Sequence, residues 1–95
     1  MKPLPTEAIA YKQTPIFTQA TVPDALQNRH STKPEVWGKI CVLSGQLSYY
    51  ILPEPSETHI LTPESPGVIE PQIPHYVTLM DDVEFFVEFY RIAKQ

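Results

Sequence analysis

The sequence predicts an all-β fold, a single-domain jelly-roll β-barrel or sandwich. Eleven prolines and only three glycines in 95 residues interrupt helices. The apolar residues occur in runs of about four to eight residues between turn signals, and no long stretch has helical periodicity. Short strands separated by tight turns must close into a barrel or form two facing sheets, because one flat sheet would leave an apolar face in water.

The first third of the chain is marked by prolines. The length allows one domain, residues 1–95, in which residues 1–10 are expected to form an extended segment with at most one turn of helix. Residues 11–14 and 16–20 predict one strand, interrupted by Pro15 and therefore kinked or at a sheet edge. Residues 23–26 indicate a turn or a single helical turn, and residues 26–31 indicate a further strand that carries His30.

The clearest central strand is VWGKICVLS at residues 36–44, which is apolar on both faces. Gly45 and Gln46 then turn the chain, and residues 47–52 (LSYYIL) return. This spacing predicts a β-hairpin.

A short strand is predicted at residues 58–61, between a polar loop at 53–57 and a turn at 62–66. His59 lies on this strand and is expected at the surface. The following stretch, GVIEPQIPHYV at residues 67–77, contains the strand residues Val68 and Ile69 and then a bend. Pro71 and Pro74 stiffen this bend, so we expect His75 to be held in a fixed direction.

The last strand, VEFFVEFYR at residues 83–91, follows a turn at Asp81 and Asp82 and is the most aromatic segment. Strand alternation separates its side chains into two groups. One face carries Glu84, Phe86, Glu88 and Tyr90, and the other carries Val83, Phe85, Val87 and Phe89. Both faces are therefore largely apolar.

Composition and charge exclude several classes of partner. The net charge is -4 and the seven basic residues are scattered, which argues against nucleic acid. No apolar run approaches the roughly 20 residues of a membrane helix, and no signal-peptide pattern is present, so a cytoplasmic protein is expected. The single cysteine, Cys41, lies in an apolar run and is expected to act as a small hydrophobic residue.

Two stretches resemble the motifs of cupins. VLSGQLSYY is similar to the strand-turn-strand around the glycine that closes the first cupin motif, and GVIEPQIPH is similar to the second motif. Glu70 stands where that motif has a proline, and Gln72 stands where it has a glycine. The first motif's H-x-H and glutamate are missing, because Gly38 occupies the glutamate's place, seven residues before Gly45. The four-ligand cupin site therefore does not carry over intact.

Nearly the whole chain resembles the small cupin-like family found at the N-terminus of tellurite-resistance protein B and in stand-alone bacterial proteins. The stretches that carry this resemblance are RHSTKPEVWGKICVLSGQLSYY, PGVIEPQIPH and FFVEFY. The resemblance implies a fold and a site more firmly than a reaction, and it implies a role in the response to tellurite or oxidative stress. Methyl transfer in the full protein belongs to a separate nucleotide-cofactor domain, and this chain shows no glycine-rich cofactor loop. We assign no catalytic or cofactor-binding residues.

Three residues are candidate metal ligands. His30 lies nearest the first cupin histidine if one or two residues are inserted, and His75 is the histidine of the second motif. Glu88 lies between aromatic residues on the last strand, where a buried carboxylate is costly without a cation. Two histidines and a carboxylate suit iron or zinc. Glu70 is a reserve ligand because it is close to His75.

Alternatives to this metal site remain open. Glu88 could instead pair with Arg29 or Arg91, with His30 at the surface. The domain would then be a metal-free module that binds or senses a small molecule. Its pocket would be lined by Trp37, Tyr49, Tyr50, Phe86 and Tyr90. If the metal site forms, the domain uses a divalent ion held by His30, His75 and Glu88 to bind or act on a small anion or organic acid.

A homodimer is the expected assembly. The last strand is apolar on both faces, and so are residues 36–43, whereas a small barrel covers only one face of each strand. The uncovered face is expected to meet a second copy.

Overall fold

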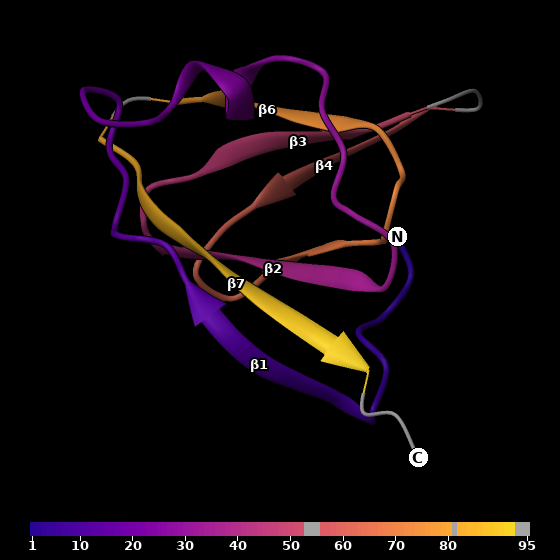
Figure 1. Cartoon of the computed structure of the whole chain (residues 1–95). Helices are drawn as coiled ribbons and strands as arrows, with labels where there is room; N and C mark the ends of the chain where they lie inside the picture. The colour runs from indigo at the N-terminus through magenta and orange to yellow at the C-terminus, as the bar shows by residue number, and fades with distance from the viewer. Residues whose placement is uncertain (53–55, 81, 93–95) are drawn as a thin grey trace.

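The computed structural model describes residues 1–52, 56–80 and 82–92, and it consists of two antiparallel β-sheets that face one another (Figure 1). One sheet has the order β1-β7-β2-β5 and the other has the order β4-β3-β6. The elements are β1 (Ala8–Gln13), the 3₁₀ helix η1 (Asp24–Gln27), β2 (Val36–Ser44), β3 (Leu47–Ile51), β4 (Glu57–Leu61), β5 (Gly67–Ile69), β6 (His75–Leu79) and β7 (Glu84–Ile92). The predicted all-β sandwich is confirmed. Over the described part of the chain, no helix has the length and apolar character needed to cross a membrane.

The core lies between the two sheets and is built by strand alternation. Phe85 and Val87 of β7 point inward, and the edge of the Phe17 ring packs on Phe85 with ring centroids 5.7 Å apart. The predicted division of β7 into two faces is therefore correct, and the Phe85 face is the buried one. The other buried hydrophobic side chains are Ile40, Val42, Leu47, Tyr49, Leu61, Ile69, Val77 and Val83.

The predicted hairpin between β2 and β3 is wrong. β2 pairs with β5 along one edge and with β7 along the other, while β3 pairs with β4 and β6 in the second sheet. Because both edges of β2 are occupied, β3 has no edge left to join. The turn at Gly45, which has a φ of 73°, carries the chain from one sheet to the other.

The N-terminal strand differs from its prediction. β1 begins at Ala8, inside the segment expected to be merely extended, and ends at Gln13. The strand predicted at residues 16–20 reduces to a single bridge between Phe17 and Phe85, whose backbone groups exchange hydrogen bonds of 2.6 and 3.1 Å. Pro15 lacks the N–H that a continuing ladder would need.

The strand predicted at residues 26–31 is also wrong, whereas the predicted helical turn before it is present as η1. Leu26 packs against the core, and Asn28 Nδ2 donates to the Asp24 carbonyl oxygen at 2.8 Å, which closes the turn. Only His30 reaches the sheet, through a bridge to His75. The strand predicted at 58–61 is confirmed as β4, and the strand residues Val68 and Ile69 lie in β5, after which β6 begins at His75. The loop at 53–57 and the turn at Asp81 lie partly outside the described residues.

Candidate functional site

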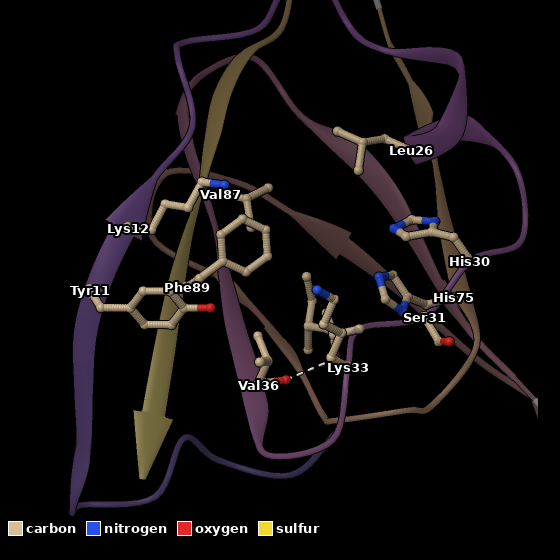
Figure 2. Close-up of a pocket in the computed structure, with 12 residues that line it drawn as sticks. Tyr11, Lys12, Leu26, His30, Ser31, Lys33, Val36, His75, Val87 and Phe89 are labelled. Carbon is tan, nitrogen blue, oxygen red and sulfur yellow. Dashed lines mark hydrogen bonds between the residues drawn. The ribbon is translucent and has the colours of Figure 1, made fainter. Parts of the chain in front are cut away.

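A cavity of about 330 Å³ opens beside His30 and His75, between the segment that follows η1 and the inner side of β1 and β7 (Figure 2). Its apolar lining comes from Leu26, Val36, Ile69, Val87 and Phe89, and its polar lining from Tyr11, Lys12, His30, Ser31, Thr32, Lys33 and His75. Among these lining residues there are two lysines and no carboxylate, although the whole chain has a net charge of -4. The cavity therefore gathers positive charge beside an apolar wall.

His75 is the most buried polar residue of the site, with only 2% of its surface exposed. Its ring is held by a hydrogen bond of 2.9 Å between Nδ1 and the Ile73 carbonyl oxygen. Because a carbonyl oxygen only accepts, Nδ1 carries the proton and Nε2 keeps its lone pair. Nε2 is buried and has no hydrogen-bond partner within the described residues. An unpaired buried acceptor of this kind costs free energy unless a ligand satisfies it.

Burial keeps His75 uncharged. The pKa of His75 is lowered to about 4, chiefly by burial; the hydrogen bond to Ile73 opposes this shift and the nearby His30 adds to it. A neutral imidazole at pH 7 presents its lone pair to a metal ion or a hydrogen-bond donor.

His30 lies directly beside His75. The two residues exchange backbone hydrogen bonds of 3.0 and 2.8 Å, and their ring centroids are 4.2 Å apart. His30 Nδ1 lies 2.9 Å from the Asn28 carbonyl oxygen, so this ring is also oriented by a backbone acceptor. The structure thus brings together two of the three predicted ligands, each with Nδ1 held and Nε2 as the lone-pair nitrogen.

Glu88, the third predicted ligand, faces away from the cavity. It lies on the face of β7 opposite to Phe85 and Val87, where the Tyr90 hydroxyl donates to its Oε1 at 2.5 Å. The Glu88 carboxylate raises the pKa of Tyr90 to about 12. The alternative partner Arg91 instead lies over the Tyr11 ring, 4.2 Å from its centroid.

The reserve ligand Glu70 also lies outside the cavity. It pairs with Lys2 at 3.7 Å and lines a separate, smaller cavity of about 130 Å³. His59 is bound to Glu57, with Nε2 3.0 Å from Oε2. Within residues 1–52, 56–80 and 82–92, no group of three or more His, Cys, Asp or Glu side chains gathers in a way that could hold a metal ion.

The aromatic pocket expected for a metal-free module is not formed by the residues proposed for it. Tyr49 is in the core and donates to the Val68 carbonyl oxygen at 2.9 Å, while Tyr50 stacks on Tyr76 with centroids 4.5 Å apart. Trp37 and Tyr90 pair across the outer side of β2 and β7. None of them lines the cavity.

Sequence reasoning missed Lys12 and Lys33 as site residues. They are 21 positions apart and look like two of the scattered basic residues. Lys33 could have been found from the sequence, because it lies between His30 and β2 in RHSTKP, part of a stretch that carries the family resemblance. Lys12 lies on β1, which the structure places next to β7.

Comparison with known proteins places the chain in a family. The model of the TehB-like domain matches residues 12–87. The chain belongs to the TehB-like family. The match covers β2 to β6 completely, together with both histidines of the cavity.

Two curated relatives of this TehB-like domain are longer proteins. Two proteins from Haemophilus influenzae strains, each described as a probable S-adenosyl-L-methionine-dependent methyltransferase TehB, are 44% and 43% identical over 89 residues. The alignment covers 88% of this chain, which spans about a third, 31%, of those relatives.

Two solved structures share the fold. The crystal structure of TehB from Haemophilus influenzae matches with a TM-score of 0.81 and 42% identity. The match covers 92% of this chain and 32% of the TehB chain. A structure of a protein from Escherichia coli K12 matches with a TM-score of 0.87 and 22% identity. The match covers 99% of this chain and 100% of the Escherichia coli chain.

Proposed function

We propose that this TehB-like domain binds a small organic anion in the cavity beside His30 and His75. One observation carries the proposal: the cavity lining combines two lysines with the unpartnered Nε2 of His75 and has no carboxylate among its described residues. A site with an apolar wall and a few convergent polar groups is the usual form of a small-molecule pocket.

Each part of the lining has a role in this proposal. The apolar wall, which includes Leu26 and Phe89, holds the carbon skeleton of the ligand. Lys12 and Lys33 attract its negative charge, and Figure 2 shows Lys33 extending toward the space beside His75. His75 Nε2 accepts a hydrogen bond from a hydroxyl group of the ligand.

A divalent metal ion is the second candidate for the partner of His75 Nε2. Histidines that bind metals commonly donate their other ring nitrogen to a backbone carbonyl, as Nδ1 of His75 and Nδ1 of His30 are placed to do. The two Nε2 atoms fit zinc or iron as part of a ligand set, which water or the anion would complete. A bound ion would polarise an oxygen of the ligand. Glu88 is not included, because it faces the other side of the sheet.

The relatives suggest a setting for this binding. Because the matched region is 31% of a probable methyltransferase, we propose that the domain serves such a protein as a ligand-binding unit and does not itself transfer methyl groups. The family also suggests a response to tellurite or oxidative stress. Its small-molecule ligand would be recognised in the same cavity.

Titration of the purified protein tests the proposal. Calorimetry with small carboxylic acids, with and without Zn²⁺ or Fe²⁺, is combined with elemental analysis of protein purified without added metal. Lys33→Ala is expected to weaken anion binding by about tenfold or more, because it removes one of two charges from the cavity. His75→Ala is expected to lose both ligand and metal, whereas the matched control His59→Ala retains them.

The outcomes separate the two candidates. Anion binding that needs Lys33 but no metal supports the metal-free module, and stoichiometric metal that depends on His30 and His75 supports the metal centre. The absence of both, or equal binding by the His75→Ala and His59→Ala variants, contradicts the proposed site.

We also propose that the domain forms a homodimer through the outer side of β2 and β7. Half-buried Trp37, Phe86 and Tyr90 lie on this side, and Leu43 near the end of β2 is 48% exposed. Aromatic and aliphatic side chains gathered on one face in this way commonly mark a contact with another protein.

A further inference from the structure

We infer that two copies of the domain pack face to face about a two-fold axis that runs parallel to β2 and β7 and passes between them. The inference rests on the proposed homodimer and specifies its geometry. The surface involved, the β2–β7 outer face, is made of three residues from each strand. These residues are Trp37, Lys39, Cys41, Phe86, Glu88 and Tyr90.

The strand register gives this face an ordered pattern. Trp37 lies opposite Tyr90, Lys39 opposite Glu88 and Cys41 opposite Phe86, so a charged pair is flanked on both sides by apolar pairs. All six side chains are half-buried in the single chain. The next residues along each strand, such as Ile40 and Val87, point to the core on the other side.

The two charges are available to another molecule. Lys39 and Glu88 are cross-strand neighbours, yet they form no ion pair with each other in the described structure. Within the described residues, the hydrogen bond that the Glu88 carboxylate accepts comes from the Tyr90 hydroxyl, which carries no charge. An apolar face with an unpaired lysine and glutamate at its centre suits a partner that presents the opposite charges at the same spacing.

A second copy of the domain presents charges opposite to those of Lys39 and Glu88 when the two copies are related by a two-fold axis parallel to the strands. An axis parallel to the strands, midway between β2 and β7, lays β2 of each copy over β7 of the other. Lys39 of each copy then meets Glu88 of the other, Trp37 meets Tyr90, and Cys41 meets Phe86. Such a contact is self-complementary, as a two-fold interface requires.

The other two-fold arrangement is disfavoured by charge. An axis across the strands lays β2 over β2 and β7 over β7, so that Lys39 faces Lys39 and Glu88 faces Glu88. Like charges at the centre of an interface oppose association. Two sheets stack with their strands aligned within about 30° and about 10 Å apart, so the first arrangement needs no unusual packing.

Charge reversal tests the arrangement. The wild type, Lys39→Glu, Glu88→Lys and the double variant are compared by sedimentation equilibrium over a wide concentration range, with circular dichroism to confirm folding. Each single variant places like charges together and is expected to raise the dimer dissociation constant by about tenfold or more. The double variant exchanges the two charges and should dimerise like the wild type. A mixture of the two single variants should form a heterodimer.

Controls separate the possible failures. Glu64→Lys makes the same charge change as Glu88→Lys on the exposed turn between Thr62 and Ser65 and should leave dimerisation unchanged. A wild type that is monomeric at every concentration overturns the homodimer itself. A wild-type dimer that is indifferent to both single variants overturns this arrangement alone. Glu88→Lys should bind anions as the wild type does, so a defect in the cavity is recognised independently.

Discussion

His75 is a histidine that folding keeps neutral, and this makes the stability of the domain depend on pH. Its pKa falls from 6.5 to about 4 on folding, chiefly because of burial. Between these values the unfolded chain binds a proton that the folded chain does not, so stability is lost as pH falls from about 6.5 to about 4 and is fully present above that window. The difference corresponds to roughly 3 kcal/mol.

Urea unfolding of the metal-free protein at several pH values measures this dependence. His75→Gln removes the titrating group and should flatten the curve relative to the wild type, whereas the control His59→Gln, on β4 outside the core, should leave most of the pH dependence in place. If the His75→Gln and wild-type curves stay parallel from pH 4 to 6.5, His75 is not the group responsible.

Single residues of the site were predictable where a local pattern oriented them. Pro71 and Pro74 marked His75 correctly as a fixed residue, and the cupin-like spacing placed His30 near it. Glu88 was not predictable in the same way. Alternation showed which residues share its face, but both faces of β7 are aromatic, so the sequence alone did not tell which one meets the core.

At the scale of elements, the turn after β2 is tightly constrained. Gly45 has a φ of 73°, and a Cβ added there would lie 3.0 Å from both the Asp82 carbonyl oxygen and Val83 Cα. Both are backbone atoms, which do not move aside easily. Gly45→Ala is therefore expected to lower the free energy of unfolding by about 1–3 kcal/mol.

Chemical denaturation checks this prediction. Gln46→Ala, at the exposed neighbouring position, should change stability by less than about 0.5 kcal/mol. Gly45→Asn should recover part of the loss, because asparagine tolerates this backbone region better than alanine. Equal stability of Gly45→Ala and the wild type would show that the turn relaxes without cost.

The strands themselves were largely predictable, but their pairing was not. Residues 36–44 form a strand with the predicted limits because their apolar side chains on both faces favour it. A two-residue connection to β3 suits a hairpin equally well in sequence. The pairing of β2 is determined by β5 and β7, which lie far along the chain and occupy both edges of β2.

At the scale of the whole molecule, the two sheets share one core and should unfold together. Leu61 belongs to β4 in one sheet, and Trp37, the single tryptophan, belongs to β2 in the other. Leu61→Ala is expected to cost about 2–5 kcal/mol. Because Leu61 is 1% exposed and lies in the common core, this loss should shift the unfolding seen by Trp37 fluorescence as far as that seen by far-UV circular dichroism.

Ile40→Val, in the sheet of Trp37, provides a milder comparison, because it is expected to lower the free energy of unfolding by about 0.5–1.5 kcal/mol. Its two transitions should also coincide. A Leu61→Ala protein whose circular dichroism changes at lower denaturant than its Trp37 fluorescence would reveal two independently unfolding layers.

The passage of the chain from β2 into the opposite sheet also bears on how fast the domain folds. Among the described strands, only β3 and β4 pair as sequence neighbours, while β1 must wait for β7, which begins at Glu84. The chain loses the entropy of closing these long loops before the distant strand pairs stabilise it, so folding should take milliseconds to seconds rather than microseconds. On the ribosome, β1 and the β7-facing edge of β2 stay unpaired until β7 has emerged, and a chaperone that shields strand edges would act during that interval.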